Sequence, residues 1–425
     1  MINIIDKKDC VGCNACAQRC PKQCISMQED EQGFLYPKVD LSLCIDCHLC
    51  EKVCPVINQA DPRKPIETFA AKNTDEKVRM TSSSGGIFYA LAKKIIEEGG
   101  VVFGAKFNDK WEVVHDYAET LEDVKAFQGS KYVQSRIGET FIQAEKFLKS
   151  GRKVMFTGTP CQIAALGLFL RKDYDDQLLK VDVVCHGVPS PLVWREYLKY
   201  ITRPEGASAG KNTVFSSLKD RPVITGISFR DKRLGWEKFG FSVRIAANQV
   251  SGKNSVFQSV NTEKKEQELF FESLDRNLYL KGFLTNTFLR PSCYQCPSRS
   301  GKSQADISLA DFWGIGRFRP SFYSKHGVSL VLAYNSKAQK TLSDIGLALM
   351  TTLFENALKF NPAIENDTKL SAKYNQFWDL YKQAGIEAID EISKSASPSL
   401  ISRIKKRIKD RCKPLVYFIM KFIYR

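Results

Sequence analysis

Nine of the fourteen cysteines lie in the first 54 residues, and eight of them form two copies of one spacing pattern. The pattern is Cys-x2-Cys-x2-Cys-x3-Cys-Pro, and it starts at Cys10 and again at Cys44. The eight residues are Cys10, Cys13, Cys16, Cys20, Cys44, Cys47, Cys50 and Cys54. Thiols at such short intervals indicate metal ligands, because gaps of two residues wrap a loop around one centre. In a reducing compartment this clustering favours metal binding over disulfides.

The spacing is typical of bacterial two-cluster ferredoxins, in which the fourth cysteine of each motif binds the cluster of the other motif. One 4Fe-4S cluster is therefore predicted on Cys10, Cys13, Cys16 and Cys54. The other is predicted on Cys20, Cys44, Cys47 and Cys50. Two zinc sites are the alternative, but zinc gives no reason for two complete copies that each end in proline. Cys24 has no counterpart after Cys54, and we interpret it as a buried thiol rather than a ligand.

A second group of four cysteines lies in the rest of the chain: Cys161, Cys185, Cys293 and Cys296. Cys161 and Cys185 each come directly after a predicted strand. The carboxyl ends of parallel strands form the edge at which open α/β folds bind ligands. Together with the Cys293-x2-Cys296 pair, these residues add up to four thiols. From the residues alone, an iron-sulfur cluster, a four-cysteine zinc site and separate buried thiols all stay open.

The elements that position these cysteines are predicted from apolar periodicity. Apolar residues on one helical face predict a helix over 86–98, which ends at Gly99-Gly100. Further helices are predicted over 139–148, from 162 and over 191–200, and strands over 101–105, 154–156 and 179–184. This alternation indicates a largely parallel α/β sheet. Residues 205–260 are richer in strand-forming and polar residues.

At 425 residues, with 43% hydrophobic and 26% charged residues, the chain is expected to fold into two or three domains. The segment 59–65 contains two prolines and fits a linker. We predict a small α+β domain of the bacterial ferredoxin type over residues 1–60. A mixed, partly parallel α/β domain is predicted over 61–395, and a basic amphipathic tail over 396–425.

Several separated segments of the middle domain resemble the beta subunit family of coenzyme F(420)-reducing hydrogenases and dehydrogenases. They are SSSGG at 82–86, GSKYVQS at 129–135, TGTPCQ at 157–162, CHGVPS at 185–190, the Cys293-x2-Cys296 pair, ADI at 305–307 and DFWG at 311–314. Segments 230–232 and 235–236 resemble a further part of the family and could face a substrate, although strand residues beside a turn explain them equally well. The resemblance implies an iron-sulfur flavoprotein with FAD and, on Cys161, Cys185, Cys293 and Cys296, a third 4Fe-4S cluster.

The same resemblance implies a flavin site that includes Ser83, Ser84, Gly85, Gly86, Lys131, Tyr132, Thr159 and His186. Segment 82–86 opens a helix, so its hydroxyl and N–H groups could hold a pyrophosphate. An ordinary serine cap, with glycines for close packing, explains it as well. Lys131 and Tyr132 could supply a phosphate contact and a stacking ring, or be a solvated lysine and a half-buried aromatic. No Gly-x-Gly-x-x-Gly follows a predicted strand, so a Rossmann site is not supported.

His186 has two interpretations of its own. It could donate a hydrogen bond to a cluster sulfur or a flavin oxygen, or it could cap a helix. No residue is predicted to be catalytic.

The formal charge of +16 is distributed unevenly along the chain. The first 60 residues carry six basic and eight acidic residues, whereas residues 401–425 carry nine basic residues and one acidic residue. Basic and apolar residues alternate in this tail, which indicates either an interfacial membrane anchor or a helix packed on the body. The chain lacks a recognisable nucleic-acid-binding fold, so nucleic acid is not expected as a partner.

No run of 18 apolar residues occurs, and the start of the chain lacks the apolar region of a secretory signal. We therefore expect a cytoplasmic protein, peripheral on the inner face of the membrane if the tail is an anchor. The predicted function is an iron-sulfur flavoprotein oxidoreductase that takes electrons from reduced ferredoxin or a similar donor and acts on a small organic substrate. The resemblance suggests cell-surface polysaccharide biosynthesis as its pathway. A non-catalytic electron-transfer subunit and a deazaflavin-coenzyme reductase are the alternatives.

Overall fold

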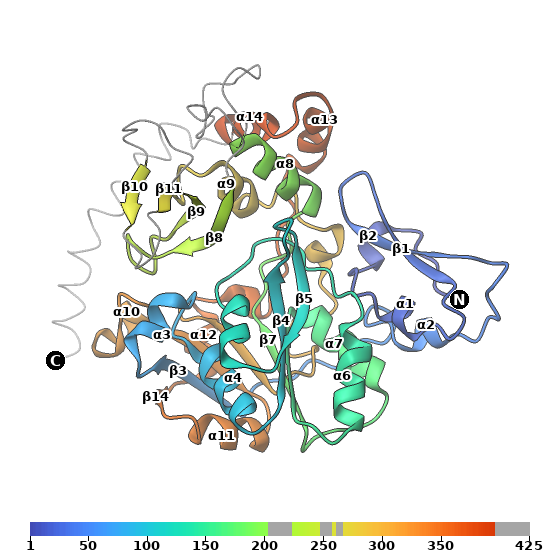
Figure 1. The fold of residues 1–425 in the computed structure, drawn as a ribbon, viewed down its shortest axis with the longest axis horizontal. Coiled ribbons are helices and arrows are strands. Elements are labelled where there is room, and N and C mark those ends of the chain that lie inside the picture. Colours follow the sequence, from blue (N-terminus) through green and yellow to red (C-terminus); the bar gives the residue numbers. More distant parts are fainter. Residues whose placement is uncertain (203–222, 247–256, 261–266, 396–425) are drawn as a thin grey trace.

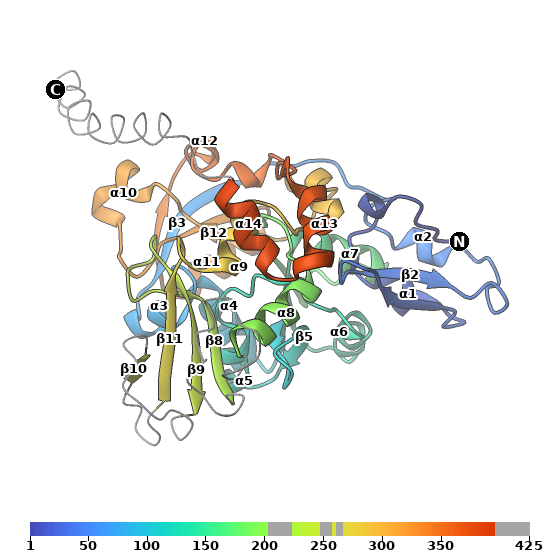
Figure 2. The same ribbon diagram turned by 90° about the horizontal axis from the view of Figure 1, so that it is seen from above.

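The structure is a computed structural model that describes residues 1–202, 223–246, 257–260 and 267–395. Its first part is a small domain, the head, at one end of the longest axis (Figures 1 and 2). The head contains the hairpin of β1 (Ile25–Glu29) and β2 (Leu35–Val39) and the short helices α1 (Ala15–Arg19) and α2 (Leu49–Lys52). The doubled motif folds as a doubled structure, because each helix follows a left-handed residue, Asn14 or His48, and carries the third cysteine of its motif.

The larger part of the molecule, the body, is built on an eight-stranded sheet with the order β14-β3-β13-β12-β7-β6-β4-β5. Its strands are β3 (Glu67–Asn73), β4 (Val101–Phe107), β5 (Val113–Ala118), β6 (Val154–Gly158), β7 (Leu178–Val183), β12 (Ile307–Asp311), β13 (Ser329–Ala333) and β14 (Leu347–Thr351). The four central strands β4, β6, β7 and β12 are parallel, and the strands on both sides pair antiparallel. The predicted class, a mixed and partly parallel α/β fold behind a small ferredoxin-like region, is confirmed.

Helices cover both faces of this sheet (Figure 1). On one face, α4 (Ile87–Glu97) and α11 (Ser336–Ser343) bury apolar side chains such as Leu91 and Leu342 against the strands. On the other face, α6 (Thr140–Lys149) and α7 (Pro160–Leu170) pack through Phe141, Leu166 and their neighbours, and the head packs on the same core. The helices cover the two faces of the sheet but not the carboxyl edge of its parallel strands, which is the edge where such folds bind ligands.

A second, antiparallel sheet has the order β10-β11-β9-β8. Its strands are β8 (Ile224–Asp231), β9 (Gly240–Ala246), β10 (Phe257–Val260) and β11 (Gln267–Ser273). The helices around it are α8 (Pro191–Ile201), α9 (Leu278–Leu284), α13 (Tyr374–Ala384) and α14 (Glu387–Ser395). Aromatic side chains form the core between them, with Trp194 and Phe229 only 4.8 Å apart between ring centroids.

The remaining short elements are α3 (Glu76–Thr81), α5 (Leu121–Val124), α10 (Ile315–Phe318), α12 (Phe354–Leu358) and the 3-10 helix η4 (Pro291–Gln295). In the described part of the chain, no helix is both long enough and apolar enough to cross a membrane. The predicted basic tail, residues 396–425, lies outside the described residues.

Three cysteine sets and a candidate cofactor site

The first set, called the inner set here, consists of Cys10, Cys13, Cys16 and Cys54. Burial is the main cause that raises the pKa of Cys16 to about 12, and the nearby thiols of Cys10 and Cys54 contribute to this shift. Burial also raises the pKa of Cys13, with added contributions from Cys16, Cys54 and Cys10. The structure thus brings the last cysteine of the second motif next to the first three cysteines of the first motif, which is the crossed arrangement that the sequence predicts.

The second set, the outer set, consists of Cys20, Cys44, Cys47 and Cys50, and it lines one cavity of the head. Cys47 is exposed, whereas Cys50 is buried and accepts a hydrogen bond on Sγ from the backbone N–H of Ile2, at 3.2 Å. Every residue that lines this cavity belongs to the head. The inner set, in contrast, adjoins the body, because Val11 and Cys13 belong to the same apolar core as α6 and α7.

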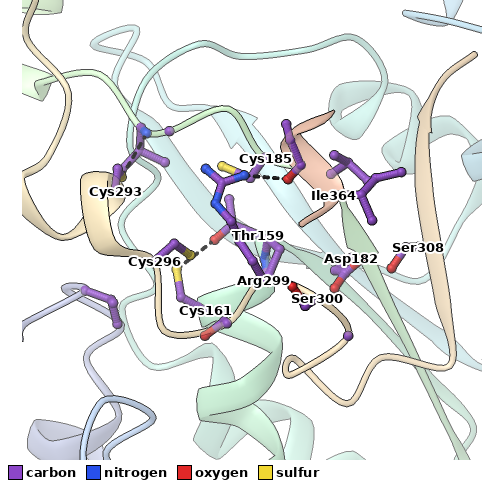
Figure 3. Close-up of a pocket in the computed structure, with 18 of the residues that line it drawn as sticks. Thr159, Cys161, Asp182, Cys185, Cys293, Cys296, Arg299, Ser300, Ser308 and Ile364 are labelled. Atoms are coloured by element: carbon purple, nitrogen blue, oxygen red, sulfur yellow. Dashed lines mark hydrogen bonds between the residues drawn. The ribbon is translucent and has the colours of Figure 1, made fainter. Parts of the chain in front are cut away.

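The third set, the body set, consists of Cys161, Cys185, Cys293 and Cys296, and all four line one cavity at the carboxyl edge of the large sheet (Figure 3). Cys161 lies in the first turn of α7 after β6, and Cys185 follows the end of β7. Cys293 lies in η4, and Cys296 comes directly after it. The strand ends and η4 therefore bring together four thiols from three separate parts of the chain.

The raised pKa values of the body-set thiols are consistent with thiolates whose charge is compensated by bound iron. Burial raises the pKa of Cys161, Cys185 and Cys293 to about 12 each, and in each case a neighbouring thiol of the set adds to the rise. Buried thiols of this kind become thiolates when a metal compensates their charge. The backbone N–H of Val188 also points at the Cys293 Sγ, at 3.4 Å. Hydrogen bonds to sulfur are a common feature of iron-sulfur sites.

The arrangement differs from a site for a single metal ion. Within the described ranges, no three His, Cys, Asp or Glu side chains are close enough together to hold one ion. The cysteines of the outer set instead surround one cavity, and those of the body set surround another.

Arg290 connects the inner set with the body set. Its guanidinium is buried and donates to the backbone carbonyls of Cys10 (2.7 Å) and Leu35 (3.0 Å) and to the Gln134 side chain (3.1 Å). Arg290 and Val11 also line the cavity of the body set. The peptide segment that carries the inner set therefore reaches the wall of the body set.

The residues predicted to hold a flavin lie in two adjacent loops and on the neighbouring strand ends. Ser83 Oγ accepts hydrogen bonds from the backbone N–H of Ser130, at 2.6 Å, and from its hydroxyl, at 2.8 Å, so segments 82–86 and 129–132 are in contact. Ser84 Oγ donates to the carbonyl of Val328, and Gly85 N–H donates to Ser329 Oγ. Gly86 precedes α4 in a left-handed conformation.

Gly85 supports the close-packing interpretation of its segment. A Cβ at this position would lie 2.5 Å from the carbonyl oxygen of Ala71 and 2.8 Å from the backbone nitrogen of Ser329. Only glycine lets segment 82–86 lie this close to β3 and β13. Gly85 therefore packs against the sheet, whereas Ser83 contacts the neighbouring loop at Ser130.

Lys131, Tyr132 and His186 are partly or wholly withdrawn from solvent. Burial lowers the pKa of Lys131 to about 7, and its amine donates to the backbone carbonyl of Gln128 at 3.0 Å. Tyr132 stacks on Phe283 with 4.7 Å between ring centroids, and His186 meets the same ring edge-on at 5.2 Å.

Thr159 is the N-cap of α7, and its Oγ1 lies 3.2 Å from Cys161 Sγ. Thr159 therefore belongs to the cavity of the body set.

A buried ion pair between Arg230 and Asp311 lies beside Tyr132, and the sequence alone gives little indication of it. Arg230, on β8, forms an ion pair with Asp311 at the end of β12, and both side chains are largely buried. The indole N–H of Trp236 donates to the same carboxylate at 2.8 Å, and Trp236 stacks on Trp313 at 5.2 Å. The sequence singles out these segments, but only the fold places β8 against the end of β12.

Lys232 adds a second buried amine near segment 82–86. It donates to the backbone carbonyls of Arg79, Ser84 and His326, and burial lowers its pKa to about 7. Neither Lys131 nor Lys232 has a carboxylate within ion-pair distance among the described residues. Lys232 uses all three of its N–H donors on backbone carbonyls, whereas Lys131 uses two, on Gln128 and Gly129, and keeps one donor that fits a phosphate-bearing ligand.

Models of known families match three segments of the chain. Residues 9–58 match the 4Fe-4S dicluster domain. Residues 68–140 match the N-terminal domain, and residues 151–214 the C-terminal domain, of the coenzyme F420 hydrogenase/dehydrogenase beta subunit.

Similar proteins include an uncharacterized protein of Methanocaldococcus jannaschii, 26% identical over 201 residues, which are 40% of this chain and 55% of that protein. An uncharacterized ferredoxin of the same organism is 34% identical over 68 residues, 15% of this chain and 87% of the ferredoxin. Subunit I of the NADH-quinone oxidoreductase of Pelobacter propionicus is 40% identical over 57 residues, 12% of this chain and 31% of the subunit. The matched region thus spans about half of the first of these relatives.

Among solved structures, a chain of the F420-reducing [NiFe] hydrogenase complex from Methanosarcina barkeri matches 77% of this chain and 91% of its own length. Its TM-score is 0.39 and its sequence identity 18%.

Proposed function

The chain carries a 4Fe-4S dicluster domain followed by both domains of the coenzyme F420 hydrogenase/dehydrogenase beta subunit, and on this premise we propose that it is an iron-sulfur flavoprotein oxidoreductase. It accepts single electrons from reduced ferredoxin or a similar donor and reduces or oxidises a small organic substrate. The outer, inner and body sets would each hold one 4Fe-4S cluster, and the residues around Ser83, Lys131 and Tyr132 would hold FAD. When bound, the clusters supply one-electron transfer, and the flavin exchanges single electrons for electron pairs.

The observation that carries this proposal is the order of the three cysteine sets. The outer set is exposed at Cys47, the inner set packs on the body through Cys13, and the body set lies beyond Val11 at the carboxyl edge of the sheet. A protein that only stores metal has no need for such an order. A protein that passes electrons from its surface to a buried site needs it.

The donor is expected to dock on the head at the outer set. Leu43 and Ile45 lie on both sides of Cys44 and are 54% and 59% exposed, and Cys47 lies on the same loop. Exposed apolar side chains next to a redox centre let a partner approach closely. A ferredoxin-like donor is thus proposed to contact residues 41–48.

The chain's own residues would prepare the flavin site for its ligand. The amine of Lys131 lies in the loop that contacts the segment opening α4, and it would carry a full positive charge when a phosphate compensates its burial. Tyr132 is held against Phe283 and presents an aromatic side chain beside the Arg230–Asp311 pair. The body set lies on the same sheet edge, so an electron would have a short path between the two sites.

The test uses the full chain, purified without oxygen, and a Cys44→Ala variant. The wild-type protein is expected to contain FAD, and reduced ferredoxin should bleach the flavin absorbance. Cys44→Ala should keep the flavin and its reduction by dithionite, but it should lose reduction by ferredoxin, because the entry site lacks its cluster.

Protein without bound flavin would contradict the enzyme function and leave an electron-transfer subunit. Equal reduction of both proteins by ferredoxin would contradict entry at the outer set. Flavin reoxidation with a panel of metabolites, coenzyme F420 among them, then identifies the substrate class. The role in polysaccharide biosynthesis stays a prediction.

A further inference from the structure

Five cysteines, rather than four, surround the cavity of the outer set. Cys24 lines it together with Cys20, Cys44, Cys47 and Cys50. Cys24 is 5% exposed, and its Sγ lies 3.3 Å from the Cys20 Sγ. The thiol of Cys44 is a second neighbour of the Cys24 thiol. A 4Fe-4S cluster takes four cysteine ligands, so one thiol at this cavity has another role.

A bound cluster would determine which of the two sulfurs, of Cys20 or of Cys24, carries the proton of their hydrogen bond. In the absence of iron, either sulfur can be the donor of this hydrogen bond. A cysteine that binds iron is a thiolate and carries no proton. If Cys20 is the ligand, as its place in the motif predicts, the single proton between the two sulfurs belongs to Cys24. Cys24 then donates an S–H···S hydrogen bond to a cluster ligand.

The inner set has no such donor at the matching position. Asn58 follows Cys54 by four residues, as Cys24 follows Cys20. Its side-chain amide donates to the backbone carbonyls of Glu51 and Cys54, at 2.6 and 3.1 Å, and thus to oxygen rather than to sulfur. Both fourth cysteines accept backbone hydrogen bonds, but among the described residues only Cys20 has a side-chain partner, the thiol of Cys24.

We propose that Cys24 is a non-ligating thiol that donates a hydrogen bond to Cys20 and raises the reduction potential of the cluster on the outer set. Reduction adds one electron to the cluster and moves no proton, so its ligand sulfurs become more negative and accept hydrogen bonds more strongly. A hydrogen-bond donor in contact with a ligand sulfur therefore stabilises the reduced cluster more than the oxidised one. The head thereby has two clusters of different potential from two copies of one motif.

The experiment compares the full chain with its Cys24→Ala and Cys24→Ser variants by iron analysis and by redox titration monitored with electron paramagnetic resonance. Both variants should retain the wild-type iron content, since Cys24 is not a ligand. One midpoint potential should fall in Cys24→Ala, and the others should stay. Cys24→Ser keeps a donor, so its potential should lie between those of the wild type and Cys24→Ala. Asn58→Ala is the matched control and should move no potential.

Two results would overturn the proposal. Unchanged potentials in Cys24→Ala would show that the thiol does not act on the cluster. Loss of about four irons in both Cys24 variants would make Cys24 a ligand. The inference requires only a cluster on the outer set from the proposed function, and a wild-type protein without iron in the head would contradict that function instead.

Discussion

His115 is a buried titratable side chain whose state follows from its neighbours. It lies on β5, stacks on Phe156 and shares a 3.0 Å hydrogen bond between Nε2 and the carbonyl of Thr157. A carbonyl only accepts, so Nε2 carries the proton. Burial is the main cause that lowers the pKa of His115 to about 4, and the charge of Lys131 contributes a smaller part of this shift. The ring is therefore neutral throughout the physiological range.

We predict that this histidine makes the fold less stable in mild acid. Between pH 6.5 and 4, His115 binds a proton in the unfolded chain but not in the folded protein. The free energy of unfolding therefore falls as the pH is lowered through this window. The expected loss from this group between pH 7 and pH 5 is about 2 kcal/mol. Urea unfolding of the wild type and of His115→Gln at both pH values measures it. Equal losses in the two proteins would contradict this assignment.

At the scale of elements, the local periodicity of the sequence predicts the parallel part of the sheet and its helices. The helices predicted over 86–98 and 191–200 correspond to Ile87–Glu97 and Pro191–Ile201. The helix expected from 162 begins at Pro160, because Thr159 and Gln162 form a capping box and proline suits the first turn. These features depend on residues close together in the chain.

The antiparallel flanks and the pairing of site residues could not be predicted in the same way. β13 and β14 both pair with β3, which lies far earlier in the chain, and no local period encodes this pairing. The Arg230–Asp311 ion pair and the contact of Tyr132 with Phe283 likewise depend on how the second sheet packs on the first. The convergence of the body set came from the family resemblance, while strand ends indicated only the places of Cys161 and Cys185.

Arg290 joins the head to η4 through buried hydrogen bonds, and this gives a prediction for the element scale. Arg290→Lys keeps the charge but cannot direct donors at three separate oxygens. It should lower the free energy of unfolding by about 2–4 kcal/mol, because it leaves buried carbonyls without partners. It should also slow flavin reduction by ferredoxin more than reduction by dithionite.

The matched control is Arg195→Lys, since Arg195 on α8 pairs with Glu29 on β1 at the half-exposed rim of the same junction. An exposed ion pair contributes about 0.2–1 kcal/mol, so this variant should stay close to the wild type. Denaturant unfolding of the two variants side by side makes the measurement. Equal effects would mean that the buried guanidinium does not hold the head.

At the scale of the whole molecule, the distribution of cysteines and charge describes a path with a defined entry. The acidic head carries the outer and inner sets, and the body carries the third set at the edge of its sheet. Twelve of the fourteen cysteines belong to these sets, and Cys24 lies beside one of them. Cys412 and the basic tail lie outside the described residues, and the membrane association of the tail stays a prediction.

The central claim is that each of the three sets holds one 4Fe-4S cluster, and iron content tests it most directly. Protein purified and reconstituted without oxygen should bind about twelve irons per chain, and Cys293→Ala should bind about eight, because only the body set loses a ligand. Absorbance and iron analysis of both proteins under the same conditions give the answer. A wild type with about eight irons, or a Cys293→Ala variant that keeps all twelve, would contradict the claim.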